Sequence, residues 1–159
     1  MKVLIISDTH GRNSRLDEVW DAEKDVDMVI HLGDIEGGEI YLDRLYYCPI
    51  HMVKGNNDYF SDLPMEKEIK IGKYRVLITH GHQYGVSMGP DHLITEGKLR
   101  GVDIVMHGHT HRPYLDSRSG IIALNPGSLT YPRQEGRRPA YMVMNINSAG
   151  ELSFEQKYL

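Results

Sequence analysis

Seven side chains of metal-binding type lie in five short segments that are far apart in the sequence. Mixed carboxylate, amide and imidazole ligands suit Mn, Fe, Zn, Co or Ni better than Ca or Mg, which favour oxygen ligands alone. Seven ligands are too many for one catalytic ion, but they suit two ions that share a bridging carboxylate. The candidate metal ligands are Asp8, His10, Asp34, Asn56, His80, His109 and His111.

Each of these five segments comes directly after a predicted strand. Ligands of open α/β sheets bind at the carboxyl ends of the strands, so residues far apart in the chain converge there. Residues i and i+2 of an extended segment point the same way, so Asp8 with His10, and His109 with His111, are expected to face one site. A lone histidine at a strand end is more often a hydrogen-bonded loop residue, but the whole set favours metal. Glycines beside the ligands permit the backbone turns, namely Gly33, Gly55, Gly81 and Gly108.

The first part of the chain alternates predicted strands and helices. Residues 2–7, 28–32 and 50–53 are apolar and short enough for buried strands. Asn13 is expected to cap a helix whose apolar side chains recur with a helical period, and a second helix is expected over residues 39–47. This alternation predicts an α/β fold with right-handed crossovers.

The second half of the sequence has more short turn sequences of the kind that join the strands of β-hairpins. A helix is expected over residues 90–100, and we expect the strands here to pair mostly antiparallel. No internal repeat or long linker interrupts the sequence, so we predict one domain over residues 1–159 with two packed sheets. The expected strands are residues 67–71, 74–79 and 102–106, two strands around Ser119 and Gly120, and a final pair over 141–146 and 152–156.

Composition narrows the class of protein. The single cysteine, Cys48, excludes an internal disulfide, and the first residues lack the pattern of a secretion signal. We therefore expect a soluble cytoplasmic protein with no membrane partner. The net charge of −4 and the absence of a basic block argue against long nucleic acid as a partner, although a small phosphate ester remains possible.

The ordered motifs resemble those of the calcineurin-like metallophosphoesterase superfamily. The resemblance rests on Asp8-x-His10, Gly33-Asp34, Gly55-Asn56-Asn57-Asp58, His80 and Gly108-His109-x-His111. The short chain and the segment Asn125-Pro126-Gly127-Ser128, which leads to Pro132-Arg133, resemble the small bacterial and archaeal phosphodiesterase branch. The match extends from Val3 to about Tyr141.

The resemblance implies a fold and a partition of the ligands. The implied fold is a four-layer αββα sandwich of two mixed sheets flanked by helices. One metal ion would be held by Asp8, His10, Asp34 and His111, and the other by Asp34, Asn56, His80 and His109. Asp34 would bridge two divalent ions, with Mn²⁺ expected and Ni²⁺, Fe²⁺, Zn²⁺ or Co²⁺ as alternatives.

The resemblance also implies an activity, the hydrolysis of a small phosphodiester by in-line attack of a hydroxide that bridges the two metals. Three alternatives stay open at this point. They are a broad phosphomonoesterase, a single-metal hydrolase of amides or lactones, and a non-catalytic protein-binding scaffold like the eukaryotic retromer subunit of this fold. Members of the branch often self-associate, so a dimer or tetramer is a possible assembly.

Four further residues carry weaker predictions. Asn57 stands where many superfamily members have a histidine on the leaving-group side, and an amide cannot be a general acid. His82 is a candidate replacement proton donor, or a residue that hydrogen-bonds a ligand. Arg133 is a candidate to hold a phosphoryl oxygen, with a surface salt bridge as the alternative. Arg12 has the same two interpretations, with the salt bridge favoured.

Overall fold

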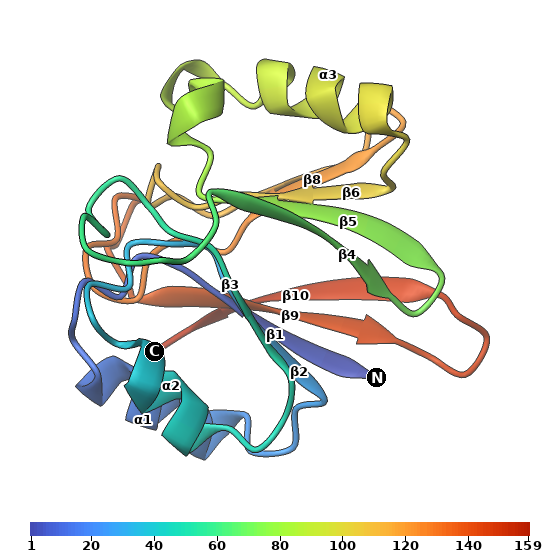
Figure 1. The fold of residues 1–159 in the computed structure, drawn as a ribbon. Helices are drawn as coiled ribbons and strands as arrows, with labels where there is room; N and C mark the ends of the chain where they lie inside the picture. The colour runs from blue at the N-terminus through green and yellow to red at the C-terminus, as the bar shows by residue number, and fades with distance from the viewer.

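Two five-stranded sheets lie face to face in the computed structural model, which describes residues 1–159. Figure 1 shows two helices below the first sheet and one helix above the second, which gives four layers. The predicted αββα sandwich of two mixed sheets is therefore confirmed. No helix combines the length and the apolar character that crossing a membrane requires.

The first sheet has the order β10-β9-β1-β2-β3. Strands β1, β2 and β3 run parallel, whereas β9 pairs antiparallel with both β1 and β10. The crossovers from β1 to β2 and from β2 to β3 contain α1 and α2. The bounds are β1 Lys2–Ile6, α1 Ser14–Ala22, β2 Met28–His31, α2 Glu39–Leu45, β3 Ile50–Met52, β9 Ala140–Ile146 and β10 Leu152–Tyr158.

The second sheet has the order β4-β5-β6-β8-β7. Its central strands β5, β6 and β8 run parallel, and the edge strands β4 and β7 pair antiparallel. Two short 3₁₀ helices, η1 and η2, precede α3. The bounds are β4 Glu66–Ile71, β5 Tyr74–Thr79, η1 His82–Tyr84, η2 Val86–Met88, α3 Asp91–Arg100, β6 Ile104–Met106, β7 Tyr114–Asp116 and β8 Ile122–Asn125.

The continuous apolar run of β1 is explained by burial on both faces. Val3 and Ile5 belong to the core between the two sheets, whereas Leu4 and Ile6 belong to the core under α1 and α2. Alternate side chains of a strand point to opposite faces, so a strand between two layers needs apolar residues at every position. A third core packs α3 on the outer face of the second sheet.

Two expectations about the elements need correction. Asn13 precedes α1, but its side chain makes no capping hydrogen bond because its backbone already has helical angles, φ −66° and ψ −24°. A side-chain cap requires extended backbone at that position. The second half also contains fewer antiparallel strand pairs than expected. Helix α3 forms a crossover connection from β5 to β6, so these two strands pair parallel.

The arrangement brings six loops to one edge of the sandwich. The loops after β1, β2 and β3 leave the carboxyl ends of parallel strands in the first sheet. Those after β5, β6 and β8 do the same in the second. Figure 1 shows the connecting loops gathered on the same side of the molecule. The five predicted ligand segments are the first turns of five of these loops.

Helix α3 offers a matched test of the packing. Leu93 is fully buried against the second sheet, whereas Leu99 on the same helix is 79% exposed. We expect Leu93→Ala to lower the free energy of unfolding by about 2 to 5 kcal/mol, because it leaves a cavity in a packed core. Leu99→Ala should change it by less than about 0.5 kcal/mol. Urea denaturation followed by circular dichroism measures both, and equal effects would contradict the packing described.

Candidate metal centre

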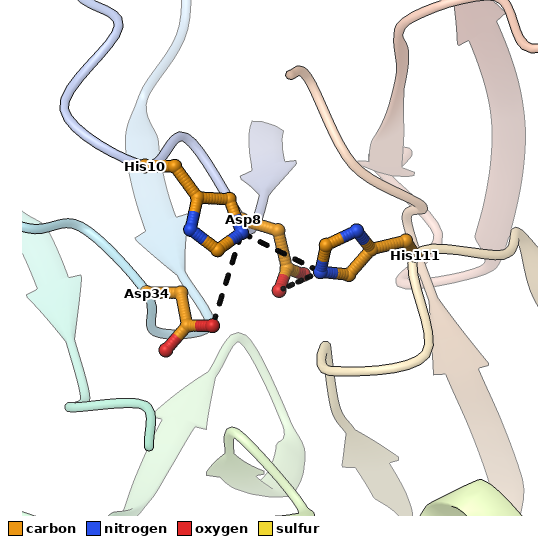
Figure 2. A group of neighbouring side chains, drawn as sticks. All are labelled: Asp8, His10, Asp34 and His111. Atoms are coloured by element: carbon orange, nitrogen blue, oxygen red, sulfur yellow. Dashed lines mark hydrogen bonds and ion pairs between the residues drawn. The ribbon is translucent and has the colours of Figure 1, made fainter. Parts of the chain in front are cut away.

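Four of the predicted ligands form a tight cluster. One donor atom from each of Asp8, His10, Asp34 and His111 lies within 4.8 Å of the others. In Figure 2 these side chains point toward a common centre from three different loops. His111 Nε2 lies 3.0 Å from Asp8 Oδ1, and His10 Nε2 lies 3.5 Å from His111 Nε2 and 3.9 Å from Asp34 Oδ2.

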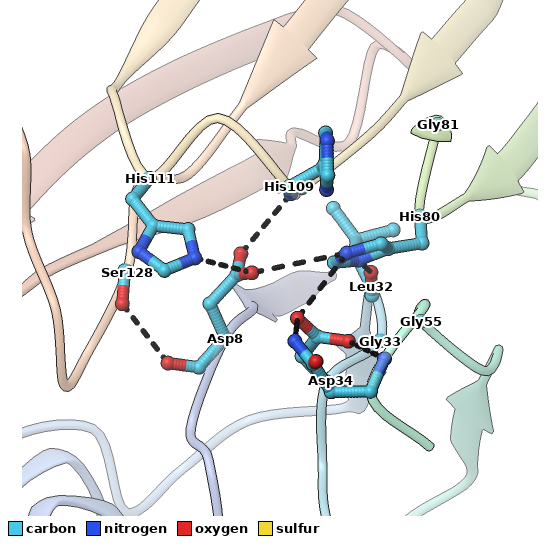
Figure 3. A network of polar contacts seen from close by, with 12 residues as sticks. Asp8, Leu32, Gly33, Asp34, Gly55, His80, Gly81, His109, His111 and Ser128 are labelled. Carbon is cyan, nitrogen blue, oxygen red and sulfur yellow. Dashed lines mark hydrogen bonds and ion pairs between the residues drawn. The ribbon is translucent and has the colours of Figure 1, made fainter. Parts of the chain in front are cut away.

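Two more predicted ligands, His80 and His109, adjoin this cluster. His80 Nε2 lies 3.5 Å from Asp34 Oδ2 and 4.0 Å from Asp8 Oδ1. The ring of His109 lies 5.2 Å from the ring of His80, and its backbone N–H donates to Asp8 Oδ2 over 3.3 Å (Figure 3). Asn56, in contrast, is exposed and its side chain forms no hydrogen bond.

The backbone at the site differs from the expected extended geometry. Seven residues other than glycine have positive φ, and five of them are predicted ligands, which is a conformation that costs energy for such residues. Asp8 and His10 converge through two left-handed turns, and so do His109 and His111. The i, i+2 argument was therefore wrong about the backbone. The φ values are 55° for Asp8, 47° for His10, 56° for Asp34, 67° for His109 and 58° for His111.

Two of the glycines beside the ligands, Gly55 and Gly108, are needed because a side chain would not fit there. Their backbone angles are not unusual. A Cβ added to Gly55 would lie 2.1 Å from Asp34 Oδ1, and one added to Gly108 would lie 2.0 Å from Ser7 Oγ and 2.9 Å from Asp8 Oδ2. Neither glycine has positive φ. Only glycine fits at these positions, because the neighbouring loops contact its backbone directly.

Three imidazoles of the site share one hydrogen-bonding arrangement. In each, Nδ1 lies 2.7 Å from an oxygen outside the cluster, whereas Nε2 faces the cluster. A carbonyl or carboxylate oxygen can only accept, so Nδ1 carries the proton and Nε2 of the neutral ring offers a lone pair. The pairs are His10 with Glu36 Oε1, His80 with the carbonyl of Leu32, and His111 with the carbonyl of Tyr131.

This donor set fits a divalent cation. Asp8 is fully buried and Asp34 almost so, and Asp8 Oδ1 and His80 Nε2 are buried atoms without a hydrogen-bond partner. A buried polar atom without a hydrogen-bond partner costs free energy. His111 Nε2 lies 3.0 Å from Asp8 Oδ1, and lone pairs at this distance repel each other unless a positive charge lies between them. A metal ion satisfies oxygen and nitrogen donors together, and imidazoles held through Nδ1 are the usual form of such ligands.

The close packing of carboxylates and imidazoles also shifts the pKa values of Asp8, Asp34 and His80. Burial raises the pKa of Asp8, but contact with His111 and the charge of His80 lower it more, so its pKa lies below the ordinary value. Burial likewise raises the pKa of Asp34, but His80 and the hydrogen bonds from Asn57 bring it below its ordinary value. Burial lowers the pKa of His80, yet the two carboxylates raise it overall. The centre thus favours positive charge beside two ionised carboxylates.

The structure also places the other candidate residues. The side-chain amide of Asn57 donates to Asp34 Oδ2 over 2.7 Å, and its backbone N–H donates to Asp34 Oδ1 over 2.9 Å. The half-buried His82 lies beside His80 and His109, at ring distances of 5.6 and 6.1 Å, and its Nδ1 has no partner. Asn57 therefore contacts a predicted ligand, and His82 lies next to two.

Neither of the two arginine candidates makes a salt bridge. Arg133 is exposed, and its backbone N–H donates to the carbonyl of His111 over 3.0 Å. Arg12 lies over the ring of Tyr131 at 5.1 Å and donates to its hydroxyl over 3.2 Å. The salt bridge favoured for Arg12 is thus replaced by an aromatic contact.

Several further residues support the ligands, and the sequence predicted neither the role of Glu36 nor that of Ser128. Glu36 and the carbonyl of Tyr131 hold imidazoles, and Ser128 Oγ donates to the carbonyl of Asp8 over 2.9 Å. Asp58 accepts hydrogen bonds from the backbone N–H groups of Glu36 and Gly55, both over 2.7 Å, and so joins the loops after β2 and β3. The sequence indicated the segment Asn125-Pro126-Gly127-Ser128, but it did not predict the hydrogen bond that Ser128 donates.

Two stacked mixed sheets with a carboxylate and histidine cluster at their common edge define an α/β sandwich protein with a candidate metal site. Residues 1–149 match the model of the calcineurin-like phosphoesterase superfamily domain. A probable metallophosphoesterase of the archaeon Methanothermobacter thermautotrophicus is 34% identical over 152 residues, which cover 92% of this chain and 87% of that protein. The chain belongs to the calcineurin-like phosphoesterase superfamily.

Two further similarities bear on function. The phosphodiesterase YfcE of Escherichia coli K12 is 28% identical over 172 residues, covering 92% of this chain and 88% of that protein. The crystal structure of wild-type Vps29 from Entamoeba histolytica, complexed with Zn²⁺, is similar with a TM-score of 0.78 at 27% identity, and 99% of each chain is covered. Similarity thus extends to a protein named as a phosphodiesterase and to Vps29.

The close approach at Gly55 gives a direct test of the centre. We expect Gly55→Ala to lower Mn²⁺ affinity by about 10- to 100-fold, because the added methyl displaces the carboxylate of Asp34. Gly120→Ala is the control, since its methyl meets no atom within 4 Å. Its positive φ of 83° strains only the turn before β8, and no ligand is displaced. Isothermal titration calorimetry measures both affinities. Unchanged Mn²⁺ binding in folded Gly55→Ala would contradict the role of this contact.

Proposed function

We propose that this protein is a phosphodiesterase that holds two divalent cations and hydrolyses a small phosphodiester by in-line attack of water. The observation that carries the proposal is the position of Asp34, whose Oδ2 lies 3.9 Å from His10 Nε2 and 3.5 Å from His80 Nε2. A carboxylate placed between two groups of imidazoles is suited to bridge two ions. Such ions, when bound, supply Lewis acidity toward the phosphoryl oxygens and lower the pKa of the attacking water.

We assign the ligands to two groups. Asp8, His10, Asp34 and His111 would hold one ion, in agreement with the cluster of donor atoms within 4.8 Å. Asp34, His80 and His109 would hold the other together with Asn56, whose exposed side chain would turn inward on binding. Mn²⁺ is the expected ion, because mixed carboxylate and imidazole ligands suit it and its neighbours in the first transition row.

The surrounding residues would fix the ligands in place. Asn57 donates two hydrogen bonds to Asp34, so we assign it to orienting the bridging carboxylate and not to proton transfer. His82 is the remaining candidate for contact with the leaving group, since its Nδ1 has no partner and its ring lies beside those of His80 and His109. This arrangement needs no serine or cysteine nucleophile.

A protein-binding scaffold is the second candidate, and the similarity to Vps29 supports it. Catalysis is favoured because the carboxylates and imidazoles of the family motif converge with their lone pairs directed inward. The strained backbone at five predicted ligands costs about 1 to 3 kcal/mol at each such residue, so these side chains are held in position against a cost in stability. The similarity to a phosphodiesterase favours diesters over monoesters.

Turnover of chromogenic esters tests the activity. We expect the Mn²⁺-loaded protein to hydrolyse bis(p-nitrophenyl) phosphate with a higher kcat/KM than p-nitrophenyl phosphate. EDTA should abolish the activity, and added Mn²⁺ should restore it, because the ions supply the Lewis acidity. Release of p-nitrophenolate measures the rates. If neither ester is hydrolysed by protein that has bound metal, the scaffold is the better account.

Metal titrations of ligand variants test the shared carboxylate. Asp34→Asn should weaken both sites by at least about tenfold, since the substitution removes the charge between them. His10→Ala should weaken mainly the first site and His109→Ala mainly the second. Asp21→Asn is the control, because this aspartate is 74% exposed on α1.

Calorimetric titration with Mn²⁺ gives the affinity and the number of sites for each variant. Equal weakening of both sites in His10→Ala would refute the partition. A single site in the unaltered protein, retained with full activity, would favour the single-metal hydrolase instead.

A further inference from the structure

A depression rich in arginine lies next to the candidate metal centre. It has a volume of about 600 Å³. Three of its six lining residues are arginines and none is acidic, although the chain as a whole has a net charge of −4. We call it the arginine depression, and its lining residues are Arg112, Thr130, Tyr131, Pro132, Arg133 and Arg137.

The arginines of this depression are not neutralised by carboxylates. Arg112, Arg133 and Arg137 are exposed and form no ion pair with aspartate or glutamate. Four arginines elsewhere in the chain do form such pairs, whereas Arg12, Arg44 and Arg138 do not. Arg12 adds a fourth positive charge, because its guanidinium lies over the ring of Tyr131. Like charges gathered without counter-charges repel each other, so the group favours an anion.

The arginine depression shares a wall with the metal centre. The ring of Tyr131 lies 4.9 Å from the ring of His10, and its carbonyl accepts the hydrogen bond from His111 Nδ1 over 2.7 Å. Arg133 donates its backbone N–H to the carbonyl of His111, and Thr130 Oγ1 donates to the carbonyl of Thr9 over 2.8 Å. A substrate held at the candidate metal centre would therefore have the depression directly beside it.

Another flank of the centre has the reverse charge. A second depression of about 440 Å³ is lined by Glu36, Glu39 and Asp58, with the exposed rings of Tyr59 and Phe60 beside them. It adjoins the centre through Glu36, which contacts His10. An anionic substituent is repelled on this flank and attracted on the other, so the two flanks can fix the direction in which a substrate lies.

We propose that the arginine depression binds a second phosphate of the substrate, so that the substrate class is a phosphodiester that carries a further phosphomonoester. This inference rests on the proposed phosphodiesterase function and narrows it. Guanidinium groups pair with phosphate through two parallel hydrogen bonds, and three of them around one depression match the three free oxygens of a phosphomonoester.

A pair of chromogenic nucleotides tests the proposal. The first is the p-nitrophenyl ester of thymidine 5′-monophosphate, and the second is the same diester with an additional 3′-phosphate. We expect kcat/KM of the Mn²⁺-loaded protein to be at least about tenfold higher for the second, because charged hydrogen bonds hold the added phosphate. Arg137→Gln and, separately, Arg112→Gln should reduce this ratio.

Arg138→Gln is the matched control for Arg137→Gln. The two arginines are neighbours in sequence and their loss changes the net charge equally. The guanidinium of Arg138, however, lies 5.2 Å from the ring of Tyr158 and does not line the depression. The control should keep the ratio of the unaltered protein. A kcat/KM ratio near one for the two substrates in the unaltered protein would overturn the proposal. An equal fall of this ratio in Arg137→Gln and Arg138→Gln would overturn it too.

A binding measurement separates this proposal from the proposed function. Thymidine 3′,5′-bisphosphate and thymidine 5′-monophosphate are titrated into the Mn²⁺-loaded protein by calorimetry. Tighter binding of the bisphosphate that is lost in Arg137→Gln supports the arginine depression, even if neither diester is hydrolysed. In that case only the phosphodiesterase assignment fails. Equal affinity for both nucleotides contradicts the second phosphate site, whatever the turnover.

Discussion

Two carboxylates, Asp8 and Asp34, are buried beside each other at the edge where the two sheets meet. Burying two negative charges side by side is unfavourable unless positive charge lies between them. Inward-facing imidazoles, with their protons held on the outer nitrogen, make this place suitable for cations. Much of the surrounding structure keeps these groups in position, and the chemistry we propose depends on it.

The fold meets this constraint through parallel strands that end at a common edge. Three of the five ligand segments, those of Asp8, Asp34 and His109, turn at once into left-handed backbone. Gly55 and Gly108 let the loops approach more closely than any side chain allows. Backbone carbonyls of Leu32 and Tyr131 then fix two imidazoles. Because these carbonyls belong to other loops than the histidines they hold, the geometry requires the complete sandwich and not one local motif.

The sequence was sufficient for the layers and for the identity of the clustered residues, because buried strands and ordered motifs are local signals. It misjudged what depends on backbone angles or distant contacts. Asn13 looked like a cap, but its backbone is helical, and Asp8 and His10 converge by left-handed turns. Arg133 was a candidate to hold a phosphoryl oxygen, but Glu36 and the grouping of Arg133 with Arg112 and Arg137 were not foreseen, because Glu36 and His10, like Arg112 and Arg133, come from separate loops.

Anomalous scattering from crystals grown with saturating Mn²⁺ tests the central claim most directly. Two separate peaks are predicted, one among Asp8, His10 and His111 and the other between His80 and His109, with Asp34 between them. A single peak would contradict the bridging role of Asp34. No peak in this cluster, with the side chains placed as described, would contradict the account of the site as a metal centre.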